Sequence, residues 1–188
     1  MSGPGIGHNN GPSLEPGVSF RRHAWTRARA ELLPRLPIEI LRVRVARAKA
    51  LGLPYRTYAG VRASTGRDVI GFLFSTNALR LLRQGAAMPP DRAEKLAALE
   101  ADRVALVQGR LDPEAVLAAG PLDAARRAPL VTESWGAART RVQAVLRDRR
   151  LAADGVLMIG DTHLERDWAE AARMAGYLDA ARYFAPGG

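Results

Sequence analysis

A mainly α-helical fold is what this sequence predicts: one compact helical domain with one short strand near its C-terminal end. Of the 188 residues, 47% are hydrophobic, which is enough to bury a core, and one domain plus a tail accounts for the length. The apolar share consists largely of Ala and Leu, and aromatic residues make up only 6%. Because Ala and Leu lose little side-chain entropy in a helix, this composition favours helices over strands.

The N-terminal half divides at its Gly and Pro residues. Residues 1–19 hold five Gly and three Pro with little to bury, which predicts a flexible tail. Residues 20–85 follow as a basic helical region, in which Pro and Gly residues separate the apolar runs. The alternation Leu41-Arg-Val-Arg-Val45 is also compatible with a strand, but its Ala-rich flanks favour a helix. The helices expected here are 23–33, 38–52, 55–63 and 67–83.

Residues 86–188 are expected to form a second helical region that packs on the first. The short apolar run Gly155-Val-Leu-Met-Ile-Gly160 is bounded by turn residues, so it is the one segment interpreted as a buried strand. Asp112-Pro-Glu opens a short helix, with Asp at the cap and Pro at the first helical position. The other helices expected here are 91–108, 135–150 and 164–175.

Positive charge is concentrated in one part of the chain. The formal net charge is +9, and of the 28 basic residues only Lys49 and Lys95 are lysine. Between Arg21 and Arg83 there are 14 basic and three acidic residues, whereas from Gln84 onward 14 basic residues are balanced by 15 acidic ones. A GC-rich coding sequence can enrich arginine everywhere, but it does not place the excess in one third of the chain. Charge asymmetry of this kind indicates a polyanionic partner.

Residues 45–64 contain the pattern of two helices joined by a tight turn. A small residue stands four positions before a glycine with leucine on either side, and two apolar residues follow on an inner helix face: Ala48, Leu51, Gly52, Leu53, Tyr58 and Val61. The small residue lets two helices cross closely, and the glycine adopts the left-handed turn. In these residues the chain resembles the helix-turn-helix of bacterial DNA-binding proteins. It departs from that pattern in Pro54 and in a long first helix, and an ordinary αα-corner is the alternative.

The resemblance implies which side chains would contact nucleic acid. The second helix would enter the major groove, with Arg56 and Arg62 directed to guanine edges or phosphates and Thr57 to a phosphate. Basic residues of the preceding helix would add sequence-independent affinity through counterion release. DNA is expected in preference to RNA. The expected nucleic-acid-binding residues are Arg42, Arg44, Arg47, Lys49, Arg56, Thr57, Arg62 and Arg67.

A second motif lies near the C-terminal end. The segment Val156-Leu-Met-Ile-Gly-Asp-Thr-His-Leu-Glu-Arg-Asp167 resembles the last motif of haloacid-dehalogenase-type phosphatases. The resemblance implies Mg²⁺ ligands at Asp161 and at Glu165 or Asp167, because this ion prefers hard oxygen ligands. That family also requires a nucleophilic Asp in an Asp-x-Asp signature, which residues 1–150 lack. The simpler interpretation is a strand–turn–helix in which Asp161 or Thr162 caps the helix.

Several other classes of function are excluded or find no support. The chain has no cysteine, which excludes disulfides, thiolate catalysis and Cys-ligated zinc. Its three histidines lie far apart, so neither a metal nor another cofactor is expected. No serine lies in a Gly-x-Ser-x-Gly context. Without a signal peptide or an apolar run near the ~20 residues that span a bilayer, a cytoplasmic location and no membrane partner are expected.

The sequence therefore favours a nucleic-acid-binding protein without catalytic residues, either a DNA-binding regulator or a phage-derived factor that could form a homo-oligomer. The segment Gly5-Ile-Gly-His-Asn-Asn-Gly-Pro12 resembles an N-terminal element of many alphaproteobacterial and phage proteins, which agrees with that setting. One alternative is a helical adaptor whose basic face meets an acidic protein. A further alternative is a Mg²⁺-dependent phosphatase-like enzyme that uses Asp161 and Glu165.

Overall fold

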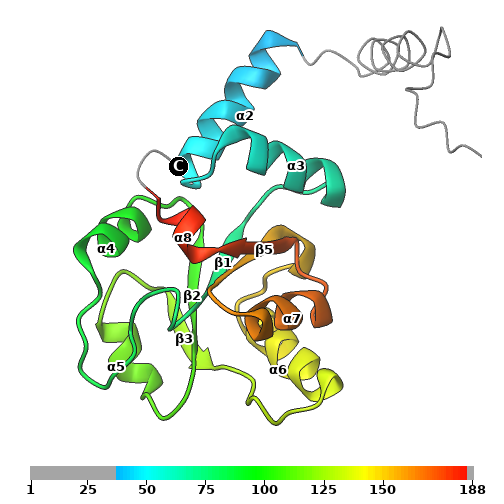
Figure 1. Ribbon diagram of the computed structural model, residues 1–188. Coiled ribbons are helices and arrows are strands. Elements are labelled where there is room, and N and C mark those ends of the chain that lie inside the picture. The colour runs from blue at the N-terminus through cyan, green and yellow to red at the C-terminus, as the bar shows by residue number, and fades with distance from the viewer. Residues whose placement is uncertain (1–36, 186–188) are drawn as a thin grey trace, which may run out of the picture. The chain divides into compact units, whose positions relative to one another are not determined.

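Five short segments form one parallel β-sheet in the computed structural model, which describes residues 37–185. They are β1 (Gly71–Ser75), β2 (Asp102–Val107), β3 (Ala124–Arg127), β4 (Val156–Gly160) and β5 (Gly176–Asp179). Their order across the sheet is β3-β2-β1-β4-β5, and every neighbouring pair is parallel. The chain thus builds one side of the sheet outward from β1, then crosses back and builds the other side from β4 (Figure 1).

Helices precede the sheet and connect its strands (Figure 1). Two of them, α2 (Ile38–Ala50) and α3 (Tyr55–Thr65), come before β1. The others are α4 (Pro90–Ala97), α5 (Pro113–Ala118), α6 (Trp135–Asp148), the 3-10 turn Ala153–Gly155, α7 (His163–Ala171) and α8 (Ala180–Tyr183). From Glu39 onward the described residues belong to one compact unit.

The strands separate two apolar cores. Phe72 and Phe74 of β1 pack in one cluster with residues of α2, α3, α4, α5 and α8, whereas Leu73 packs in another with residues of α6 and α7. This division follows from strand geometry, because successive side chains point to opposite faces of a sheet. The central strands are therefore covered on both faces, which is the usual arrangement of a parallel sheet.

The expectation of a mainly α-helical domain with one strand is wrong, and the fold is α/β. The composition wrongly predicted helices in place of strands, because the strands of this sheet are short and buried on both faces. Strands in such a sheet are continuous apolar runs with no alternation, and periodicity alone does not separate them from buried helix. The run Gly71-Phe-Leu-Phe-Ser75 is a strand of this kind, with all five residues buried.

Two of the expected helices are corrected in the same way. The helix expected over 67–83 is β1 followed by a loop, and the one expected over 91–108 is α4 followed by β2. The expected strand at 155–160 is confirmed as β4, and helices are confirmed near 38–52, 55–63, 135–150 and 164–175. The expected tail, the helix at 23–33 and the Gly5–Pro12 element lie outside the described residues. Among the described helices, none combines the length and apolar character needed to cross a membrane.

Candidate functional site

The turn between α2 and α3 is tight, a geometry that a helix-turn-helix and an ordinary αα-corner share. Ala48, near the end of α2, is 1% exposed, and the backbone N–H of Leu53 donates to its carbonyl at 2.9 Å. Gly52 has φ +58°, in the left-handed region that favours glycine. A Cβ on Gly52 would lie 2.9 Å from Cε of Lys95 in α4. Glycine is thus favoured here chiefly for its backbone conformation, because the flexible end of Lys95 can move aside.

The inner residues of the pattern attach this helix pair to the sheet. Leu51, Leu53 and Tyr58 are buried, and Val61 packs against the same core from a partly buried position. Tyr183 of α8 donates its hydroxyl hydrogen to the carbonyl of Leu51 at 3.3 Å. The pair α2–α3 is therefore fixed to the α/β unit rather than joined to it by a linker.

Three of the predicted nucleic-acid contacts make ion pairs within the protein. Arg47 lies 3.0 Å and Arg62 lies 3.7 Å from the carboxylate of Asp68. Arg67 lies 2.7 Å from the carboxylate of Asp154 in the C-terminal half. Arg47 also donates to the carbonyls of Val69 and Glu100, at 2.9 Å each, so its guanidinium braces α2 against the start of β1.

Asp68 is the common partner of Arg47, Arg62 and Tyr58, and we call these four residues the Asp68 brace. Tyr58 donates its hydroxyl hydrogen to Asp68 at 2.7 Å, opposite the Arg47 bond. Burial by itself would raise the pKa of Asp68, but the hydrogen bonds from Tyr58 and Arg47 outweigh it and hold that pKa below its ordinary value. Burial and the same bond raise the pKa of Tyr58. The carboxylate is thus an ionised connector between α2, α3 and β1.

The other predicted cations have no carboxylate within 4 Å among the described residues. Arg42, Lys49 and Arg56 are exposed and Arg44 is half-buried. Thr57 is partly buried at the first turn of α3.

Small residues form the rest of the outward face of α3. Gly60, Ala63 and Ser64 lie on the same side of the helix as Arg56 and are exposed. A Cβ built at Gly60 meets no atom within 4 Å. This face, defined by Arg56, Gly60, Ala63 and Ser64, therefore carries positive charge at its N-terminal end and only short side chains along the rest of its length. We call it the α3 face.

A second candidate site lies where β1, β2 and β4 end. Parallel sheets bind ligands beyond the carboxyl ends of their strands, at the point where the strand order reverses. Here that point lies between β1 and β4. Thr76 and Asn77 follow β1, Gln108 follows β2, and Asp161 follows β4. Polar side chains from three strand ends therefore meet at one edge.

Glu165 of α7 is the centre of this edge, and it is fully buried. One carboxylate oxygen accepts hydrogen bonds from the side-chain amides of Asn77 and Gln108, at 3.1 Å each. The other accepts from the backbone N–H groups of Asp161 and Thr162, at 2.6 Å each. Four N–H donors thus compensate the buried charge, which would otherwise cost several kcal/mol.

The same glutamate caps α7. Thr162 is the N-cap residue and accepts from the backbone of Glu165, while Glu165 accepts from the backbone of Thr162 in return. This reciprocal pair is the capping box that Thr-x-x-Glu sequences form. The strand–turn–helix interpretation of the Gly-Asp-Thr segment is confirmed, with Thr162 rather than Asp161 as the cap.

The donor set at this edge does not fit Mg²⁺. The ion requires several oxygen ligands in octahedral geometry, but both oxygens of Glu165 already accept N–H groups. Asp161 forms an ion pair with Arg80, and the residues at the end of β1 and just after it are Ser75, Thr76 and Asn77, none of them a carboxylate. Within the part of the chain that the structure describes, no three His, Asp or Glu side chains gather as a metal site.

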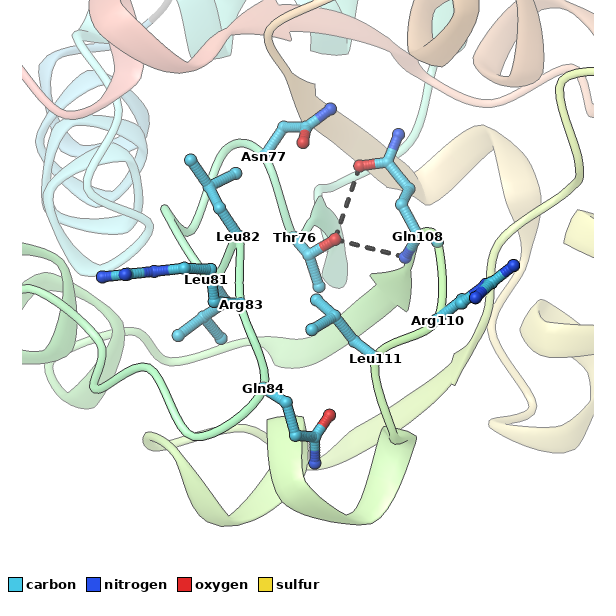
Figure 2. Close-up of a pocket in the computed structure, with 10 residues that line it drawn as sticks. Thr76, Asn77, Leu81, Leu82, Arg83, Gln84, Gln108, Arg110 and Leu111 are labelled. Carbon is cyan, nitrogen blue, oxygen red and sulfur yellow. Dashed lines mark hydrogen bonds between the residues drawn. The ribbon is translucent and has the colours of Figure 1, made fainter.

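Beside Glu165, a cavity of about 480 Å³ opens at the ends of β1 and β2 (Figure 2). Thr76 lies at its floor, where its hydroxyl accepts from the backbone N–H of Gln108 at 3.2 Å and donates to the side-chain carbonyl of Gln108 at 3.4 Å. Its lining residues are Thr76, Asn77, Leu81, Leu82, Arg83, Gln84, Gln108, Gly109, Arg110 and Leu111. We call this the edge pocket.

Comparisons with known proteins do not identify the site, so its geometry alone is interpreted. No family model, no curated protein and no solved structure matches the chain. Sequence reasoning found Asp161 and Glu165 but missed Asn77 and Gln108. Each missed residue comes just after a buried apolar run, so a prediction of Gly71–Ser75 and Val104–Val107 as parallel strands would have placed both amides at the same edge.

Proposed function

We propose that the protein binds nucleic acid, duplex DNA in preference to RNA, through the α3 face. The observation that carries the proposal is the composition of that face: Arg56 is exposed beside a row of small residues, Gly60, Ala63 and Ser64. Small side chains let a helix approach a surface closely, and an arginine near the first turn is where a recognition helix contacts base edges or phosphates.

Duplex DNA suits this face better than RNA does. The major groove of B-form DNA is about 12 Å wide and admits an α-helix, whereas the major groove of A-form RNA is too narrow. Exposed Arg42 and Lys49 on α2 supply further positive charge for phosphates. The proposal therefore rests on Arg42, Arg44, Lys49, Arg56 and Thr57. Arg47, Arg62 and Arg67 have carboxylate partners already and contribute less, because a phosphate must compete for them.

Substitutions at Gly60 test the proposal with little risk to folding, because a side chain there meets open space. In a salt-titrated anisotropy assay with a labelled random duplex, Gly60→Glu should weaken binding about ten-fold or more by like-charge repulsion with phosphates. Gly60→Gln, which has the same size without the charge, should weaken it less. Arg56→Ala should reduce the slope of log affinity against log salt by about 1. Arg139→Ala, an exposed site on α6, is the matched control.

Two outcomes would contradict the proposal. One is the absence of duplex binding at low salt. The other is equal duplex affinity for the wild type and Gly60→Glu. Parallel titrations with single-stranded DNA and RNA test the preference for duplex DNA separately.

One observation favours a second candidate, the adaptor. Ile40 and Val43 on α2 are 43% and 69% exposed and line the same groove, and exposed apolar side chains close together are typical of protein-binding surfaces. An adaptor predicts that Val43→Ser abolishes recovery of a protein partner while Gly60→Glu does not. If the protein binds DNA instead, Gly60→Glu should weaken its binding to the duplex and Val43→Ser should leave that binding unchanged.

A further inference from the structure

The edge pocket is built for a ligand of small-molecule size. Its volume of about 480 Å³ lies within the range of roughly 300–1,000 Å³ that is usual for ligand sites. It also lies at the carboxyl ends of parallel strands, where open α/β sheets bind their ligands. The α3 face is not part of it, since no residue of α2 or α3 lines the cavity.

Hydrogen bonds between its two loops fix the walls of the pocket. The side-chain carbonyl of Gln84, in the loop after β1, accepts from the backbone N–H of Asp112 at 3.0 Å. Arg127, at the end of β3, donates to the carbonyls of Leu111 at 2.6 Å and Gly109 at 3.3 Å. The loop after β1 and the loop after β2 are therefore linked by a hydrogen bond, and hydrogen bonds from Arg127 link the second loop to β3.

The lining carries positive charge with no acidic residue to balance it. Arg83 and Arg110 are exposed on opposite sides of the opening, and Figure 2 shows both side chains extending away from the cavity. Neither has a carboxylate within 4 Å among the described residues. Exposed arginine side chains change rotamer in picoseconds to nanoseconds, so either guanidinium can turn over the cavity.

Backbone groups of the lining add unused donors. Within residues 37–185, the N–H groups of Asn77, Gly109 and Arg110 donate to no protein acceptor. Adjacent backbone N–H groups at a loop bind oxyanions well. The charge of Glu165 does not oppose an anion strongly, because four N–H groups already bond to it.

The remaining walls are apolar. Leu81, Leu82 and Leu111 line the cavity, and Leu82 is 61% exposed. An inorganic ion would leave this apolar wall in water, whereas a ligand with a ring would cover it. The pocket thus combines a cationic rim with an apolar wall.

From these features we infer that the edge pocket binds a small organic anion, with its phosphate or carboxylate head at the rim that carries Arg83 and Arg110 and a ring against the leucines. Binding requires no metal ion, because the carboxylates at this edge are occupied by N–H groups and by Arg80.

The test is isothermal titration of the full chain with adenosine 5′-monophosphate, benzoate, adenosine and inorganic phosphate. At least one of the two organic anions should bind saturably and more tightly than adenosine or inorganic phosphate, and replacing Mg²⁺ with excess EDTA should not change its affinity. The double variant Arg83→Ala with Arg110→Ala should weaken binding of that anion at least ten-fold, because it removes the charge-assisted hydrogen bonds to the anionic head. Arg147→Ala, an exposed site on α6, and Arg56→Ala should leave it unchanged. The comparison of the two anions distinguishes a phosphate head from a carboxylate head.

Three results would overturn the inference. They are failure of both organic anions to bind saturably, equal affinity in the double variant, and binding that EDTA abolishes. Because both arginines are exposed, the double variant is expected to fold, and its unfolding midpoint serves as the control.

Discussion

The charge on the α3 face is exposed, whereas the charge of Glu165, beside the edge pocket, is buried. On the α3 face, Arg56 is left exposed beside small residues, and its charge is available to a partner. At the edge pocket, the charge of Glu165 is fully buried and compensated by four N–H groups. The comparison teaches that a tally of charged residues finds exposed cations, such as Arg56 or the rim residues Arg83 and Arg110, but does not find a buried carboxylate whose partners are neutral amides and backbone N–H groups.

Arginine shows the same contrast within one helix pair. Arg47 and Arg56 were both predicted to contact nucleic acid, yet Arg47 donates to Asp68, Val69 and Glu100. Arg56 has no carboxylate partner among the described residues. An excess of arginine in a sequence therefore includes structural braces as well as available charges.

Glu165→Ala is the change with the largest expected effect on stability. It removes the acceptor of four N–H groups in a buried site and leaves a void, and we expect a loss of about 3–5 kcal/mol in the free energy of unfolding. Urea denaturation measures it, with Glu170→Ala on the exposed side of α7 expected within about 0.5 kcal/mol of the wild type. A loss under about 1 kcal/mol for Glu165→Ala, or a wild-type melting temperature that falls when EDTA is added, would contradict the account of this carboxylate.

Asp68→Asn should have a smaller effect, about 1–2 kcal/mol, because the Asp68 brace is partly exposed and solvent screens its ion pairs. The effect depends on pH. The pKa of Asp68 is lower in the folded state than in the unfolded chain, so its contribution is present above the unfolded pKa and is lost as pH falls through the folded pKa.

The difference in stability between the wild type and Asp68→Asn should therefore be constant near neutral pH and shrink below about pH 4. Denaturation curves collected between neutral pH and pH 3 measure it, and Asp167→Asn, at an exposed position of α7, is the control. A difference that stays unchanged down to pH 3 would show that the Asp68 carboxylate does not provide the brace.

The sequence was informative where local chemistry decides the structure. The turn at Gly52, the cap at Thr162 and the strand at Val156–Gly160 follow from glycine conformation, capping and flanking turn residues. It misled where tertiary burial decides. Phe72, Leu73 and Phe74 fit a helix core as well as a two-sided strand, and only the covering helices on both faces select the strand.

The edge pocket could not be predicted from the sequence for the same reason. Asn77, Gln108 and Glu165 are far apart in the sequence and meet only because β1, β2 and β4 are neighbours in one parallel sheet. Without the sheet, two amides and a glutamate have no shared pattern. The candidate sites thus differ in origin, since the α3 face is local in sequence and the edge pocket is assembled by topology.

Amide hydrogen exchange of the full chain tests the separation of the two sites most directly. It should be measured for the free protein, with saturating duplex DNA, and with whichever organic anion binds more tightly in the titration. The account predicts that the duplex slows exchange in residues 55–65 and leaves residues 76–84 and 108–112 unchanged, and that the organic anion does the reverse. Protection of the pocket loops by the duplex without protection of α3, or identical footprints for both ligands, would contradict it.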